Sequence, residues 1–137
     1  MTIKNDIILW DDGANCLCLL SIPSEQQYKY IDGHPCITFG VSYENANFKG
    51  YDTITLLDRF YNNILNEMKN TYESLNGAFR IYDIGVDTDG YIEFVMKNGI
   101  AFIKGQLGAS FSSHSLKFEF QADQTLIGRL IRTIEML

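Results

Sequence analysis

The spacing of the hydrophobic residues changes along this chain, and this change constrains the fold more than any other feature. Ile37, Phe39, Val41 and Tyr43 alternate with polar or small residues, which is the period of a strand that buries one face. Between positions 57 and 75, apolar residues recur at intervals of three and four, which predicts one stripe of an amphipathic helix. Alternation returns after position 77, and a second helical stripe follows position 123. The chain is therefore predicted to form strands, a helix, strands and a helix.

The first block of strands begins with two apolar runs, at residues 3–10 and 14–22, separated by the turn signal "DDG". The second run contains "CLCLL" and is apolar on both faces, so we expect it to lie centrally in the sheet under a helix. The runs "QYKYIDG" and "CITFGVSYE" follow, and "DGHP" between them predicts a hairpin.

The central helix is predicted over residues 51–77. Asp52 or Thr53 supplies a side-chain oxygen for its N-terminus, and Gly77 stands where a helix ends. At spacings of three and four, apolar side chains lie on one side of a helix. The stripe that we expect this helix to bury consists of Leu57, Phe60, Ile64, Met68, Tyr72 and Leu75.

The second block of strands consists of "GAFRIYDIG", "GYIEFVMK", "IAFIKGQLG" and "SLKFEFQ". Short turns join these runs, so neighbouring strands are predicted to be antiparallel. In the last run, one face is expected to carry Leu116, Phe118 and Phe120, and the opposite face Lys117, Glu119 and Gln121.

Asp123 marks the change from the last strand to the last helix. Its carboxylate is predicted to accept a hydrogen bond from the backbone N–H of Thr125 or Leu126, as a helix cap does. The stripe that would then fold back onto the sheet is Leu126, Leu130, Ile134 and Leu137. We predict a single α+β domain over residues 1–137, with an antiparallel sheet of about seven or eight strands and two helices packed on one face.

The charge of the chain limits the classes of partner. The net charge of the 137 residues is −6, from 17 acidic and 11 basic side chains. Nucleic-acid binding needs phosphates neutralised by Lys and Arg, so it is not expected. The charge suits a basic protein partner, although it also serves solubility alone. No apolar run approaches the ~20 residues that cross a bilayer and no signal-peptide pattern begins the sequence, so the expected location is the cytoplasm.

Three places in the sequence carry side chains that could support metal or catalytic chemistry. Cys16, Cys18, His34 and Cys36 could fill a zinc tetrahedron, but the first two lie in a very apolar strand, where cysteine behaves as a small hydrophobe. "DTDGYIE" fails the register of a calcium loop. A serine near His114 could be activated, yet no nucleophile motif is present. We therefore expect no metal, no cofactor and no enzymatic activity.

The stretch from Ile81 to Met96 is the candidate contact surface. It contains four acidic residues and no Lys or Arg, and tyrosines are effective interface anchors. The residues predicted to contact a basic partner are Asp83, Asp87, Asp89 and Glu93, with Tyr82 and Tyr91. Asp11 and Asp12 mark a second acidic hairpin tip. A solvated hairpin is the alternative interpretation of the 81–96 stretch.

Two other functional classes remain open at this point. One is a small-molecule binding module that holds its ligand between sheet and helices with "CLCLL" and Trp10. The other is an enzyme that uses His114 and nearby serines, which requires a hydrogen bond between them inside a cleft.

The second half of the chain resembles a known family. A phenylalanine and a glycine precede an amphipathic helix in "NFKGYDTITLLDRFYNNIL", and a strand that begins with small residues follows in "NGAFRIYD". The hairpin "DTDGYIEFVMK" then precedes "LKFEFQADQTLIGRLIRTIEML". Over residues 46–137 this arrangement is similar to bacterial immunity proteins of the WapI type and to related small proteins encoded near polymorphic toxins. These often finish on a strand, then Asp-Gln-(Ser/Thr) and a leucine, then a terminal helix, and Asp123, Gln124, Thr125 and Leu126 carry that match.

The resemblance implies a non-catalytic cytosolic protein that binds and blocks one toxin domain, often a nuclease. Nuclease surfaces are basic because they hold phosphate, so an acidic inhibitor is consistent with this implication. The resemblance transfers no individual binding residues, and the acidic residues between 81 and 96 are proposed from charge and tyrosine placement alone.

Overall fold

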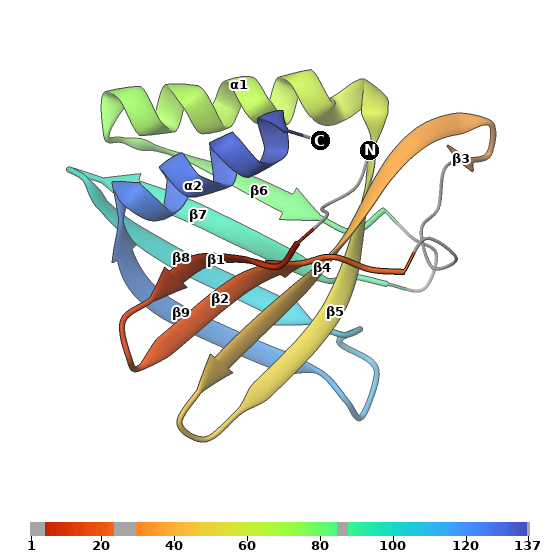
Figure 1. The fold of residues 1–137 in the computed structure, drawn as a ribbon, viewed down its shortest axis with the longest axis horizontal. Coiled ribbons are helices and arrows are strands. Elements are labelled where there is room, and N and C mark those ends of the chain that lie inside the picture. Colours follow the sequence, from red (N-terminus) through yellow and green to blue (C-terminus); the bar gives the residue numbers. More distant parts are fainter. Residues whose placement is uncertain (1–4, 24–29, 85–87, 137) are drawn as a thin grey trace.

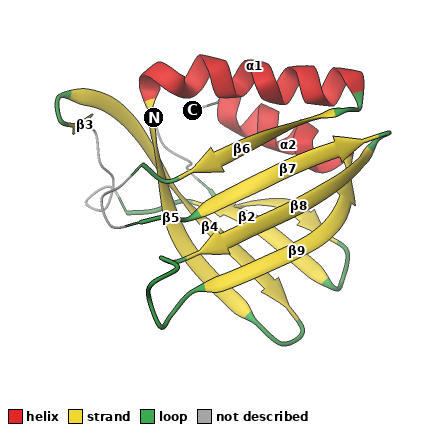
Figure 2. Ribbon diagram, turned by 180° about the vertical axis from the view of Figure 1, so that it is seen from behind, coloured by secondary structure: helices red, strands yellow, loops and turns green. Residues whose placement is uncertain are grey.

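Two antiparallel sheets face each other in this computed structural model, which describes residues 5–23, 30–84 and 88–136 (Figures 1 and 2). The first sheet has the order β1-β2-β4-β5, and the short β3 pairs with the start of β4. Its strands are β1 (Ile7–Asp11), β2 (Asn15–Leu20), β3 (Tyr30–Ile31), β4 (His34–Asn45) and β5 (Lys49–Leu57). The second sheet is a meander of β6 (Gly77–Tyr82), β7 (Tyr91–Lys97), β8 (Ile100–Leu107) and β9 (Leu116–Asp123).

The alternating apolar residues of both sheets meet in a common core. The Tyr43 ring of β4 stacks on Phe118 of β9 with ring centroids 4.3 Å apart, and Phe120 lies beside them. Gly105 of β8 is required here, because a Cβ at that position would lie 2.3 Å from the Phe118 ring. The inner faces of the two sheets are therefore packed directly against each other, and each sheet turns its other face outward.

The helices α1 (Asp58–Ser74) and α2 (Gln124–Glu135) lie side by side over one end of the paired sheets (Figure 1). Asp123 caps α2, because its carboxylate accepts a hydrogen bond of 2.8 Å from the N–H of Thr125. This cap was predicted.

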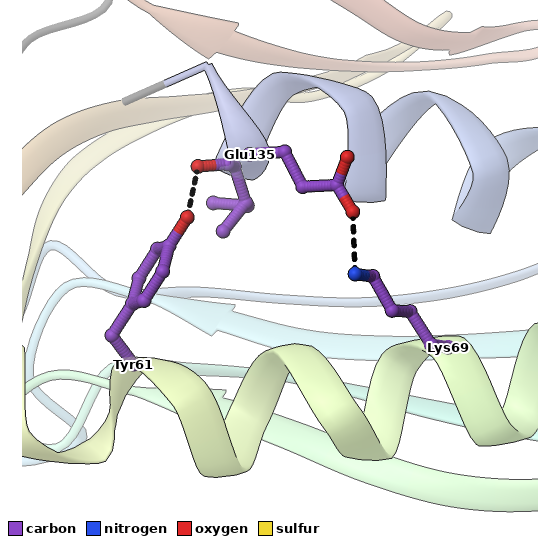
Figure 3. A network of polar contacts seen from close by, with 4 residues as sticks. Tyr61, Lys69 and Glu135 are labelled. Atoms are coloured by element: carbon purple, nitrogen blue, oxygen red, sulfur yellow. Dashed lines mark hydrogen bonds and ion pairs between the residues drawn. The ribbon is translucent and has the colours of Figure 1, made fainter.

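Two polar contacts join the helices near the end of α2 (Figure 3). The Tyr61 hydroxyl donates to the carbonyl of Ile134 at 2.7 Å, and the Lys69 ammonium lies 2.8 Å from the Glu135 carboxylate. Burial raises the pKa of Tyr61, so the phenol remains a donor in this contact.

The α+β class, the antiparallel pairing and the two helices are confirmed. The strands are divided between two facing sheets instead of forming one sheet, and the helices lie over the end of the pair. The "DGHP" hairpin is confirmed as the β3–β4 turn. β2 lies between β1 and β4 as expected, but its outward-facing Cys16 and Cys18 are only half-buried, so neither α1 nor α2 covers that face.

The start of the central helix was predicted wrongly. Residues 49–57 form β5, and α1 begins at Asp58 after Leu57, whose side chain makes no capping bond. The reason is a continuous ladder with β4, in which Ile54 faces the core while Thr53 and the buried Thr55 lie on the opposite side of the strand. Pairing with a distant strand overrides the local helical spacing.

The buried side of α1 also differs from the predicted stripe. Met68 is fully buried, but Phe60 and Tyr72 are exposed, whereas Leu65 and Thr71 are buried. The helix ends at Ser74, and the C-cap residue Leu75 adopts a left-handed conformation two residues before Gly77. Leu137 of the second predicted stripe lies outside the described residues.

Candidate functional site

Asp83 joins the end of the second sheet to the edge of β5 that does not pair with β4. Its backbone N–H donates to Gly90 at 2.9 Å, and its carboxylate accepts from the N–H of Thr55 at 3.2 Å. Ile84 donates its N–H to the carbonyl of Thr55 at 3.2 Å. This predicted contact residue therefore has a structural role at the corner where β5, β6 and β7 meet.

Asp89 is held at the same corner by three donors. Its carboxylate accepts from the Ser110 N–H at 2.7 Å, from the Ser110 hydroxyl, and from the side-chain amide of Gln106 at 2.8 Å. The hydrogen bonds from Ser110 keep the pKa of Asp89 below its ordinary value. Gln106 is buried, so Asp89 fixes the turn before β7 to the segment that follows β8.

Asp52 is a third carboxylate at this corner, and it was expected to cap a helix instead. One oxygen accepts from the Gly108 N–H at 2.8 Å. A Cβ at Gly90 would lie 2.9 Å from that same oxygen. Asp52 shares the inward face of β5 with Ile54 and Leu56. The signal for this role is a charged residue that alternates with apolar ones, as Asp52 does with Ile54 and Leu56. It can be read only when residues 49–57 are recognised as a strand.

An open pocket of about 410 Å³ lies at this corner, which we call the corner pocket. Its lining consists of Arg80, Tyr82, Asp83, Thr88, Asp89 and Gly90. The Arg80 guanidinium lies 4.0 Å from the centre of the Tyr91 ring, a cation–π contact. Tyr82 is 49% exposed. The structure thus brings together five of the six predicted residues in one region with Arg80, while Asp87 lies outside the described residues.

The outer face of the second sheet is balanced in charge, contrary to its local sequence. Cross-strand register places Arg80, Glu93, Lys104 and Glu119 side by side in one row across the four strands. Opposite charges directly across from each other attract, so Glu93 has a cation on each side. The acidic stretch between residues 81 and 96 therefore does not form a uniformly negative surface.

A second group of carboxylates lies at the tips of the β1–β2 and β4–β5 hairpins. The Asp12 carboxylate accepts hydrogen bonds from the backbone N–H groups of Asn15 and Ala14 and from the Trp10 indole. These bonds lower the pKa of Asp12 to about 2, and the bond from Asn15 has the largest effect. A pocket of about 330 Å³ between the tips is lined in part by Asp11, Cys16 and Glu44. Glu44 was not singled out from the sequence, because only the β2–β4 pairing brings it beside Cys16.

The cysteines do not assemble into the four-ligand zinc site that was weighed from the sequence. Cys16 and Cys18 have their sulfurs 3.6 Å apart, but Cys18 pairs with Ser42, six residues along β4 from Cys36, or roughly 20 Å. Burial, the contact with Cys18 and the nearby carboxylates raise the pKa of Cys16 to about 11. Within the described residues, no group of three or more His, Cys, Asp and Glu side chains is arranged to hold a metal ion.

The structure also locates the residues of the two other classes. His114 is exposed, and its contact with Ser112 is made by the backbone N–H, not by the imidazole. Leu17 and Leu19 of "CLCLL" are buried in the core between the sheets, and Trp10 packs at its border. The corner pocket and the pocket between the hairpin tips are both open at the surface. In the described part of the chain, no helix has the length and apolarity needed to span a membrane.

Comparison with known proteins adds no relative. No family model matches the chain, and no curated protein or solved structure matches it. The resemblance of residues 46–137 to WapI-type immunity proteins therefore stays a prediction, carried by the residues quoted for it.

Proposed function

We propose that this protein is a non-catalytic inhibitor that binds one basic protein, a cognate bacterial toxin domain, and blocks it by one-to-one occlusion in the cytoplasm. The WapI-type resemblance motivates the toxin as partner. A nuclease domain is the favoured class, because a surface that grips phosphate is rich in Lys and Arg.

The corner pocket is the observation that carries this proposal. Asp83 and Asp89 are fixed by backbone N–H groups, so their carboxylates are already in place before a partner arrives. Groups that are ordered in advance lose little conformational entropy on binding. Tyr82 stands half-exposed beside them and offers a flat apolar surface. This arrangement suits a Lys or Arg side chain of the partner, whose charge meets the carboxylates and whose stem packs on the ring.

Occlusion requires no chemistry from this chain. The net charge of −6 attracts a basic domain over distance and raises the rate of encounter. Once bound, the inhibitor covers the phosphate-binding surface or lies beside it, and the substrate is excluded. Leu17 and Leu19, which would line a ligand site in the alternative interpretation, are instead buried in the core, and this supports a role at the surface.

The test begins with the toxin domain encoded by a neighbouring gene. Expressed alone it should kill cells, and co-expression of this protein should restore growth and yield a stable one-to-one complex. In that complex, Tyr82→Ala is expected to weaken binding by about tenfold or more, as truncation of an aromatic anchor does. Tyr30→Ala is the matched control, because Tyr30 is an exposed tyrosine of the other sheet.

Toxicity without rescue, or rescue without a complex, would overturn the proposed function. The protein would then be a binding module for another ligand. A complex that tolerates Tyr82→Ala would keep the function and remove the corner pocket from its interface.

A further inference from the structure

The outer face of the first sheet has an apolar centre that the rest of the described chain leaves open. Register places Ile8, Cys18, Ser42 and Tyr51 side by side in one row across β1, β2, β4 and β5. Ile8 is 54% exposed and Tyr51 is 53% exposed. Large apolar side chains at both ends of one row are unusual on a sheet face in contact with water, where the outward positions of a strand are normally polar.

Gly40 makes this apolar centre continuous. A Cβ at Gly40 would lie 3.0 Å from Leu20, 3.2 Å from the Tyr51 ring and 3.3 Å from Ile22. Leu20, Tyr51 and the buried Ile22 therefore close over the glycine, and Leu20 joins the surface of the row that contains Tyr51. We call this surface the apolar row: Ile8, Cys18, Leu20, Ser42 and Tyr51.

Carboxylates border the apolar row on the side of the hairpin tips. The next row contains Asp11, Cys16, Glu44 and Lys49, in that order. Asp12 stands at the same tip, fixed by Ala14, Asn15 and Trp10. Three carboxylates therefore face one described lysine. The carboxylates of Asp11 and Glu44 contribute to the raised pKa of Cys16, which agrees with a negative potential at this border.

We propose that the apolar row with its acidic border is a docking face for the basic partner, and that it receives a surface of apolar side chains flanked by Lys or Arg. This inference rests on the proposed function for the identity of the partner and adds the face that holds it. The apolar centre supplies buried area, and the border selects cationic flanks. A second copy of this chain fits less well, since it also has a net charge of −6.

The native cysteines allow a direct test without the toxin. The probe is a short peptide of alternating leucine and lysine, which carries both features of the expected partner surface. Thiol labelling followed by mass spectrometry reports Cys16 and Cys18 at the face, and Cys36 serves as the internal control because it lies at the far end of β4. We expect the peptide to slow labelling of Cys16 and Cys18 severalfold while the rate at Cys36 is unchanged.

Variants and control peptides decide the outcome. The double variant Ile8→Ser with Tyr51→Ser should lower peptide affinity about tenfold, whereas Tyr82→Ser should not change it. A serine–lysine peptide and a leucine–glutamate peptide should both bind weakly. Equal binding of the serine–lysine peptide, protection that spares Cys16 and Cys18, or no binding would overturn the docking face. A concentration-dependent dimer lost on Tyr51→Ser would also overturn it, because the face would then serve self-association.

The same labelling on a complex with the toxin domain separates this inference from the proposed function. A stable complex that leaves Cys16 and Cys18 as reactive as in the free protein would retain the function and reject the face. Peptide binding at the face together with failure of every toxin test would retain the face and reject the toxin as partner.

Discussion

The outer faces of the two sheets differ in how their charges are arranged. On the second sheet, Arg80, Glu93 and Lys104 alternate in sign across neighbouring strands. On the first sheet, the apolar row occupies the centre and the carboxylates gather at one border. The sheets share a core, so the contrast between them belongs to the outward-facing positions of each strand.

This difference shows that charge along the chain is a poor guide to charge in space. Glu93, from the most acidic stretch of sequence, lies on the balanced face, because cations from β6 and β8 stand on either side of it. On the outer face of the first sheet, Asp11 and Glu44 are more than thirty positions apart in the sequence. Only strand pairing brings them into one row.

The largest expected loss of stability comes from a change in the core that the two sheets share. Phe118→Ala removes the ring that stacks on Tyr43 and leaves a cavity in the shared core, so we expect a loss of about 3–5 kcal/mol in the free energy of unfolding. Urea unfolding followed by Trp10 fluorescence and by circular dichroism should give coincident transitions for the variant. Separate transitions would show that the two sheets fold as independent units, which contradicts a common core.

A smaller loss is expected at the corner that joins the sheets. Asp52→Ala leaves the N–H of Gly108 without its acceptor, and we expect a loss of about 1–3 kcal/mol. Asp52→Asn retains an oxygen and should lose less. Amide hydrogen exchange near Gly108 is the local measurement. Unchanged exchange in Asp52→Ala would mean that this bond does not hold the segment after β8.

A charge reversal on each outer face tests the contrast directly. Glu93→Lys places a third cation between Arg80 and Lys104, so we expect a loss of about 0.5–1 kcal/mol that salt reduces. Glu44→Lys has one lysine opposite, Lys49, and should lose less. Urea unfolding at low and high salt measures both variants. Equal losses would remove the distinction between the balanced face and the acidic border.

Local chemistry was enough to predict several parts of this structure. The Asp123 cap depends on contacts within two residues, and the meander of the second sheet depends on short turns, so both could be predicted. Other parts of the structure depend on pairing between strands and could not be predicted from local sequence. Residues 49–57 carry an apolar spacing that also fits a helix, and only the β4 ladder makes them a strand.

The candidate site shows the same limit. Tyr82, Asp83 and Asp89 were predicted as contact residues and do line one pocket, because they are close in sequence around one turn. The structural bonds of Asp83 and Asp89 were missed, since their donors Thr55 and Ser110 are more than twenty positions away. Arg80 is basic and precedes the acidic stretch, so it was not predicted as part of the site. In the structure its guanidinium lies over the Tyr91 ring.

The smallest expected effect belongs to the apolar row, and it is the sharpest test of that face. Tyr51→Ser removes a ring that is 53% exposed, so the free energy of unfolding should change by no more than about 0.5 kcal/mol. A face kept for folding would lose stability on this change, whereas a face kept for a partner loses affinity instead. Urea unfolding of the free protein measures the first quantity, with Tyr30→Ser as the control for an exposed tyrosine away from the row. A loss well beyond that of Tyr30→Ser would mean that the chain itself uses the Tyr51 ring, since closure over Gly40 would then contribute to folding and not to docking.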